Sequence, residues 1–260
     1  QARRKIVENQ LRDFRLGGAE LPAGDKARFM QVQEELSALS AKFSDNLLDA
    51  TNAFSLFTDK REELAGIPED VLQAASKAAA EDTSITVPGW KFTLHAPSYL
   101  PVMQYADNRS LREQMYRAYT TRASELESVS DQSVNRDNMP LIEQILRLRR
   151  EEARLLGYDC YAQVSLAPKM AETPQQVLDF LNELAAKARP YAERDLAELR
   201  QFAADKLKLA QLEVWDIAYV SEKLRIERYA FSDQEVKQYF PEDKVLSGMF
   251  GLVETLYGIH

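Results

Sequence analysis

A long run without glycine or proline, Asp25–Phe57, constrains the fold of this chain more than any other feature. Its apolar residues recur every three or four positions, which is the spacing of one face of an α-helix. They are Phe29, Val32, Leu36, Leu39, Phe43, Leu47, Ala50 and Phe54. With Asp25 as the N-cap, such a helix extends about 45 Å. That length exceeds what a compact domain usually needs, so the run predicts an elongated helical protein.

The same periodicity recurs along most of the chain, because only nine glycines and ten prolines interrupt it. Thr173 supplies a cap and Pro174 a first helical residue for one long helix, in which Pro190 predicts a kink. Gly157 has the position of a glycine that ends a helix. Besides Asp25–Phe57, the predicted helices are Ala2–Phe14, Pro68–Glu81, Asp107 or Asn108 to Arg122, one that starts with Asn138 and Pro140 and ends at Gly157, Thr173–Leu207, Trp215–Glu227 and Val245–Tyr257.

One region, Ser84–His95, predicts a strand. Trp90, Phe92 and Leu94 alternate with polar residues after the turn dipeptide Pro88-Gly89. A lone strand cannot satisfy its backbone, and we expect its partner near Ser55–Thr58. The predicted fold class is therefore mainly α, with long helices in a multi-helix array and a small two-stranded antiparallel β patch near 55–58 and 90–95.

Composition narrows the classes of function. Apolar residues make up 45% of the chain and charged residues 28%, as in an ordinary soluble globular protein. The net charge of −8, with basic and acidic residues interleaved, argues against a nucleic-acid partner. No apolar run approaches the roughly 20 residues that span a bilayer, so no membrane association is expected. A single cysteine fits a reducing compartment, and the predicted location is the cytoplasm.

Few residues here can carry hydrolytic or metal chemistry. The only histidines are His95 and His260, and the only cysteine is Cys160, which we expect to be an inert, half-buried thiol. No cluster with metal-ligand spacing can be assembled from them. The sequence also lacks the glycine-rich phosphate loops and the nucleophile elbow. The best-known zinc sites and catalytic triads are therefore excluded, and a site of carboxylates and water alone stays open.

An aromatic group offers the one candidate binding feature. Trp215, Asp216 and Tyr219 fall on one helical face at i, i+1 and i+4. Core packing with a buried polar group is the more common explanation of such a group. The functional alternative is the wall of a peptide-sized groove, in which the aromatic rings stack and Asp216 orients the peptide.

Several segments together resemble the thimet-oligopeptidase family of zinc metallopeptidases. In order they are Ser98–Met103, Leu111–Tyr119, Thr121–Ser124, Leu156–Tyr158, Ser165–Ala171, Trp215–Tyr219 and Tyr239–Pro241. The resemblance covers nearly the whole chain. It implies an almost entirely helical enzyme of two lobes, with a deep channel that admits short peptides. It also implies a zinc ion held by a His-Glu-x-x-His helix and a later Glu.

None of those zinc-binding residues occurs in this chain, because the zinc helix of the family follows the part that matches residues 246–260. No zinc ligand, general base or oxyanion donor carries over to any position, and His260 matches no ligand. The resemblance does place Trp215, Asp216 and Tyr219 on the family's Trp-Asp-x-x-Tyr pattern, as candidates for the channel wall. It further assigns residues 1–105 towards the catalytic lobe and residues 106–260 to the opposing lobe.

The leading hypothesis is therefore a fragment of a zinc-dependent oligopeptidase that hydrolyses short peptides. The fragment alone is expected to bind no zinc and to be inactive, and its partner is the remainder of its own polypeptide. A second hypothesis is a stand-alone helical peptide-binding or adaptor protein without catalysis. A chaperone-like peptide holder is a third. An in-frame His-Glu-x-x-His after His260 distinguishes the first hypothesis from the second, for which a stop codon is expected there.

Overall fold

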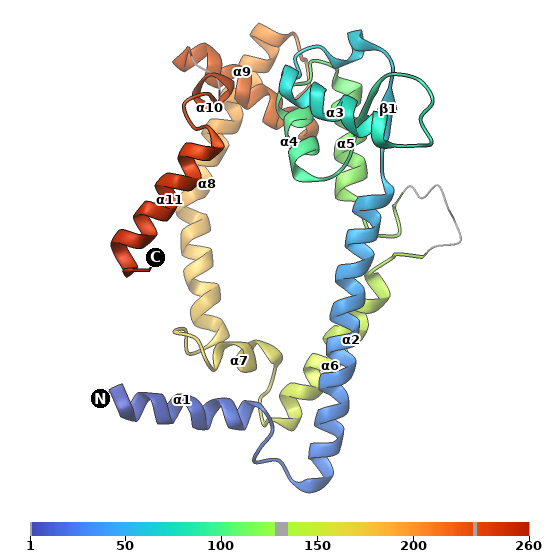
Figure 1. Ribbon diagram of the computed structural model, residues 1–260. Coiled ribbons are helices and arrows are strands. Elements are labelled where there is room, and N and C mark those ends of the chain that lie inside the picture. Colours follow the sequence, from blue (N-terminus) through green and yellow to red (C-terminus); the bar gives the residue numbers. More distant parts are fainter. Residues whose placement is uncertain (1, 128–134, 231–232, 260) are drawn as a thin grey trace. The chain divides into compact units, whose positions relative to one another are not determined.

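The computed structural model describes residues 2–127, 135–230 and 233–259 (Figure 1). The chain divides into two compact units, each built from two separate stretches of sequence. The first unit contains Gln1–Phe54 and Arg117–Asp195, and the second contains Ser55–Tyr116 and Leu196–His260. The assignment of residues 1–105 and 106–260 to two lobes concerns a longer enzyme and stays a prediction.

The first unit is helical and centres on a pair of long helices. Helix α2 packs along α6, and α7 packs against α6 (Figure 1). Phe29 and Val32 of α2 are buried, as are Leu148 and Ala153 of α6. The helices of this unit are α1 (Ala2–Leu16), α2 (Ala23–Ala53), α6 (Met139–Leu155), α7 (Tyr161–Leu166) and the first part of α8 (Pro174–Leu207).

Helix α2 confirms the long predicted helix but differs from it at both ends. Its first residue is Ala23 and its N-cap is Pro22, which makes no side-chain capping bond. The predicted N-cap Asp25 is therefore wrong, because the extended backbone of Pro22 starts the helix two residues earlier and leaves Asp25 in the first turn. At the other end the helix stops at Ala53, since the residues that follow enter a strand.

A buried amide pair joins the two long helices of the first unit. Asn46 of α2 donates a hydrogen bond from Nδ2 to Oδ1 of Asn138, the N-cap residue of α6, at 2.9 Å. Asn138 in turn donates to the backbone oxygen of Phe43 at 3.1 Å. Both side chains are buried, so water cannot replace these bonds without opening the helix pair.

Asn138→Ala is expected to lower the free energy of unfolding by about 2 kcal/mol, since it leaves the Asn46 amide buried without its acceptor. Urea unfolding followed by far-UV circular dichroism measures the change. The control is Asn182→Ala, at an exposed position of α8, which we expect to change stability by less than about 0.5 kcal/mol. Equal effects of the two substitutions would contradict a stabilising role for the amide pair.

The second unit combines short helices with a two-stranded sheet. Helix α3 packs on β2, and α4 packs against α9 (Figure 1). Its elements are β1 (Leu56–Thr58), η1 (Arg61–Leu64), α3 (Glu69–Glu81), β2 (Trp90–Phe92), α4 (Ala96–Tyr105), most of α5 (Arg109–Thr120), the last part of α8, η2 (Val214–Asp216), α9 (Ile217–Tyr229), α10 (Asp233–Lys237) and α11 (Glu242–Tyr257). One part of its hydrophobic core consists of the buried residues Ala203, Tyr219 and Val220.

The sheet confirms the predicted β patch. Strands β1 and β2 are antiparallel, with Leu56 opposite Phe92 and Thr58 opposite Trp90. The strand is shorter than the predicted region Ser84–His95, because β1 offers only three residues for pairing. Beyond Phe92 the chain soon enters α4, of which His95 is the N-cap residue. The predicted fold class, mainly α with this antiparallel pair, is thus confirmed.

Two predicted helix boundaries are confirmed by their hydrogen bonds. Asn108, one of the two candidate caps, accepts bonds at Oδ1 from the backbone N–H groups of Ser110 and Leu111. Helix α6 ends in a Schellman motif with Gly157 at φ +81°. The backbone N–H of Tyr158 donates to the backbone oxygen of Ala153, and the backbone N–H of Gly157 donates to that of Arg154.

Helix α8 continues through Pro190. Within the described residues, no helix has the length and apolarity that a membrane span requires.

Candidate functional site

The three aromatic and acidic residues singled out by the sequence lie together in the second unit. Trp215 and Asp216 belong to the 3-10 turn η2, and Tyr219 follows in the first turn of α9. The turn is held by a capping box, in which Asp216 accepts the backbone N–H of Glu213 at 3.0 Å. The Asp216 carboxylate accepts hydrogen bonds from two arginines at the start of α5.

Asp216 is the centre of a buried ionic network. Its side chain has no exposed surface, and two arginines of α5 surround it. Arg112 donates from Nη2 to Oδ1 at 2.7 Å, and Arg109 donates from Nη2 to Oδ2 at 2.7 Å. Burial by itself would raise the pKa of Asp216, but the hydrogen bonds from Arg109 and Arg112 lower the pKa below its ordinary value. Asp216 is therefore held as a carboxylate.

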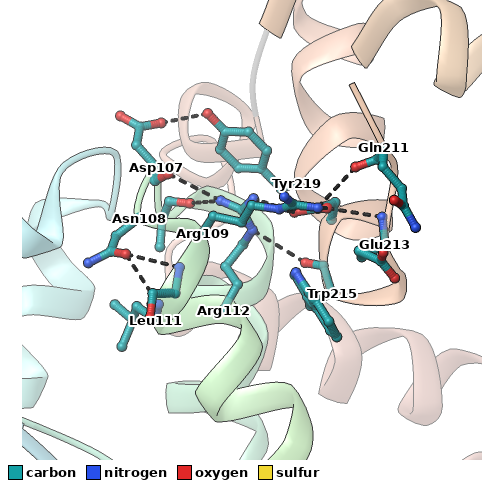
Figure 2. A network of polar contacts seen from close by, with 12 residues as sticks. Asp107, Asn108, Arg109, Leu111, Arg112, Gln211, Glu213, Trp215 and Tyr219 are labelled. Carbon is teal, nitrogen blue, oxygen red and sulfur yellow. Dashed lines mark hydrogen bonds and ion pairs between the residues drawn. The ribbon is translucent and has the colours of Figure 1, made fainter. Parts of the chain in front are cut away.

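Arg112 is as deeply buried as its partner, with 1% of its side chain exposed. A buried cation needs several acceptors, and Arg112 has them. Nη1 donates to the backbone oxygen of Ala106 at 2.6 Å, and Nε donates to that of Trp215 at 3.3 Å (Figure 2). The guanidinium carbon also lies 4.1 Å from the centre of the Tyr219 ring, in cation–π geometry.

Tyr219 extends the network to the loop before α5. Its hydroxyl donates to Oδ1 of Asp107 at 2.8 Å (Figure 2), and Lys223 pairs with the same oxygen at 3.3 Å. Burial and the neighbouring Asp107 raise the pKa of Tyr219 to about 12. The phenol therefore stays protonated and donates this bond throughout the physiological range of pH.

These contacts hold the start of α5 against the η2–α9 corner, which is the junction where η2 (Val214–Asp216) passes into α9. They therefore stabilise the local structure. Both oxygens of Asp216 accept hydrogen bonds from these arginines, Arg109 and Arg112. Trp215 is half-buried and its ring lies 6.2 Å from that of Tyr116. The part of these residues in a channel wall stays a prediction.

The arginines that complete the network were not identified from the sequence. Arg109 and Arg112 precede Asp216 by more than a hundred residues, so no local spacing connects them. One signal was available: Arg112 lies between Leu111 and Met115 on the apolar face of an amphipathic helix. An arginine at such a position needs a buried acidic partner.

The described histidine, His95, and Cys160 belong to different units. His95 is exposed before α4, and His260 lies outside the described residues. Cys160 is exposed at the N-cap of α7, so the predicted half-buried thiol is wrong; the turn after Gly157 holds it at the surface. Among the described residues, no three His, Cys, Asp or Glu side chains gather in a way that could hold a metal ion. These residues therefore do not fit a zinc site.

Comparison with known proteins identifies the family. Residues 102–260 match peptidase family M3. The chain is 49% identical over 99% of its length to oligopeptidase A of Salmonella typhimurium, and 42% identical over its whole length to a probable cytosolic oligopeptidase A of Arabidopsis thaliana. It spans about 37% and 36% of the lengths of these relatives. The resemblance to the thimet-oligopeptidase family is thus confirmed, and the chain belongs to peptidase family M3.

Proposed function

We propose that this chain is the non-catalytic part of a zinc-dependent oligopeptidase that hydrolyses short peptides in the cytoplasm. The observation that carries the proposal is the 49% identity to oligopeptidase A over nearly the whole chain. The share of that relative's length that the chain covers, 37%, is consistent with catalytic residues elsewhere in a longer polypeptide. Zinc would supply a polarised water for peptide hydrolysis.

In this proposal the chain contributes structure around a channel between two helical lobes. Residues 1–105 belong towards the catalytic lobe and residues 106–260 build the opposing lobe. The buried network around Asp216 keeps the η2–α9 corner rigid, since Arg112 and Asp216 cannot separate without leaving a buried charge. That rigidity supports Trp215 and Tyr219 as parts of the channel wall.

The 260-residue chain by itself is expected to bind no zinc stoichiometrically and to cleave no peptide, because its described residues offer no ligand set. Elemental analysis after dialysis against zinc measures the metal content, and a quenched fluorescent peptide measures turnover. The matched control is the whole reading frame of an oligopeptidase A relative, assayed with the same peptide. One bound zinc per chain together with turnover would overturn the assignment of this part as non-catalytic.

A further inference from the structure

The middle of the long helix α8 carries large apolar side chains that stay exposed (Figure 1). They lie within residues 177–193, which belong to the first unit. Their exposed fractions run from 50% to 63%, and they are Leu178, Phe180, Leu181, Leu184 and Tyr191. Single apolar residues are common on protein surfaces, whereas a group of them along one stretch of helix marks an interaction surface.

These side chains share one face of the helix. Since an α-helix turns by about 100° per residue, the five side chains and Ala188 point within an arc of about 160°. The charged residues of the same stretch all point outside that arc, and two pairs of them bond to each other, Lys187 with Glu183 and Arg189 with Glu193. An apolar arc of this width is typical of a helix that faces the core of a helical bundle. We name these six residues the apolar face of α8.

The size of the apolar face of α8 decides between a second copy of the chain and a segment of the same polypeptide as its partner. From Leu178 to Tyr191 the face is a strip of about 20 Å by 10 Å. A stable interface between separate chains removes about 800 Å² from each partner, which is far more than this strip offers. A segment joined to the chain by a covalent linker needs less area, because its effective concentration is high. The strip therefore favours a partner in the same polypeptide.

The related proteins have enough further sequence to supply such a segment. Oligopeptidase A of Salmonella typhimurium is 49% identical to this chain over 99% of the chain, yet the chain spans only 37% of that relative. Most of a polypeptide of that length therefore lies outside the part that matches this chain.

We propose that the apolar face of α8 is covered by one or more helices from the part of the polypeptide outside these 260 residues. A helix is the expected partner because Leu181, Leu184 and Ala188 repeat at steps of three and four, the spacing into which the side chains of a second helix fit. The inference rests on the proposed function in one respect, that the polypeptide is longer. It fails separately from that function, because the test measures access of a reagent and not hydrolysis.

The test compares two alanines of α8 that are both exposed but point to opposite sides, Ala188 on the apolar face and Ala186 behind it. Ala188→Cys and Ala186→Cys are each made in the 260-residue chain and in the product of the complete reading frame that contains it. The rate of maleimide alkylation is measured at the new cysteine by peptide mass spectrometry, which separates it from Cys160. Ala188→Cys is expected to react at least about tenfold more slowly in the complete product, because the reagent must wait for local opening. Ala186→Cys is the matched control and should react equally fast in both proteins.

A second variant keeps the test decisive if Ala188→Cys disturbs the packing. Leu184→Glu is expected to lower the thermal midpoint of the complete product by at least about 3 °C, since it buries an unpaired charge there. In the 260-residue chain, where Leu184 is 52% exposed, the same substitution should leave the midpoint nearly unchanged.

Three results would each overturn the proposal. The first is equal alkylation of Ala188→Cys in the two proteins together with an unchanged midpoint of the complete product carrying Leu184→Glu. The second is equal slowing of Ala188→Cys and Ala186→Cys in the complete product, which would show no preference for the apolar face. The third is alkylation of Ala188→Cys in the 260-residue chain that slows as the protein concentration rises, which would assign the face to a second copy. Loss of peptide cleavage by the complete product would contradict the proposed function and leave these rates unaffected.

Discussion

Asp216→Ala is expected to lower the free energy of unfolding of the second unit by about 3–5 kcal/mol, the effect of removing one partner of a buried ion pair. The alanine leaves Arg112 buried with no counter-charge, while Arg109 is 40% exposed and can turn to water. The capping box at η2 is lost as well, because Asp216 accepts the N–H of Glu213.

Urea unfolding followed by tryptophan fluorescence measures the stability of the second unit selectively. The two tryptophans of the chain, Trp90 and Trp215, both belong to the second unit. Asp205→Ala, at an exposed position of α8 in the same unit, is the matched control and should change stability by no more than about 0.5 kcal/mol. If Asp216→Ala and Asp205→Ala unfold at the same urea concentration, the network contributes nothing to stability.

The pKa of Asp216 adds a dependence on pH to the same comparison. The folded state lowers this pKa, so the stabilisation is fully present above the unfolded value of about 4. It is lost as the pH falls through the lower, folded-state value. The difference in stability between the unmodified chain and Asp216→Ala should therefore be constant near neutral pH and shrink in acid.

Gly66→Ala is expected to destabilise the second unit by about 2–5 kcal/mol. Gly66 has φ +87°, a left-handed conformation that costs any other residue roughly 1–2 kcal/mol. A Cβ atom there would also lie 2.3 Å from the backbone oxygen of Tyr105 and 2.9 Å from the Asp107 side chain. Backbone atoms cannot rotate away, so the chain itself must shift, at a further cost of about 1–3 kcal/mol.

Gly157→Ala is the matched control for this prediction. Gly157 has φ +81°, close to that of Gly66, but a Cβ atom there meets nothing within 4 Å. Gly157→Ala therefore includes the cost of a left-handed backbone at alanine, but no steric clash of the added Cβ atom. Thermal unfolding followed by far-UV circular dichroism should show a larger loss for Gly66→Ala. Equal losses would mean that the close approach of Gly66 to Tyr105 does not constrain the fold.

The features that were predicted best are those that depend on residues close together in the sequence. The periodicity of Phe29, Val32 and Ala50 identified α2, and alternation around Phe92 identified the strand and its partner. Gly157 was recognised as a helix end, because a left-handed glycine has a local signature. The predicted N-cap Asp25 was wrong, because two residues near the start of α2 offered competing signals. The helix begins directly after Pro22, so Asp25 lies within its first turn.

The interactions of the candidate site could not be predicted in the same way. Trp215, Asp216 and Tyr219 were identified as a group, but what Asp216 contacts depends on how α5 packs against the η2–α9 corner. Glu222 likewise reads as one more helix-surface carboxylate until Gln104 of α4 is placed beside it. Contacts between residues a hundred positions apart follow from tertiary packing, which no spacing in a single sequence reports.

The central claim is that this chain is a non-catalytic part of a longer zinc peptidase. Its most direct test is cleavage of one quenched fluorescent peptide by two proteins, the 260-residue chain and the product of the complete reading frame that contains it. We predict zinc-dependent, chelator-sensitive cleavage by the longer product and none by the chain alone. Cleavage by the 260-residue chain, or a complete reading frame that ends at His260 and cleaves nothing, would contradict the account.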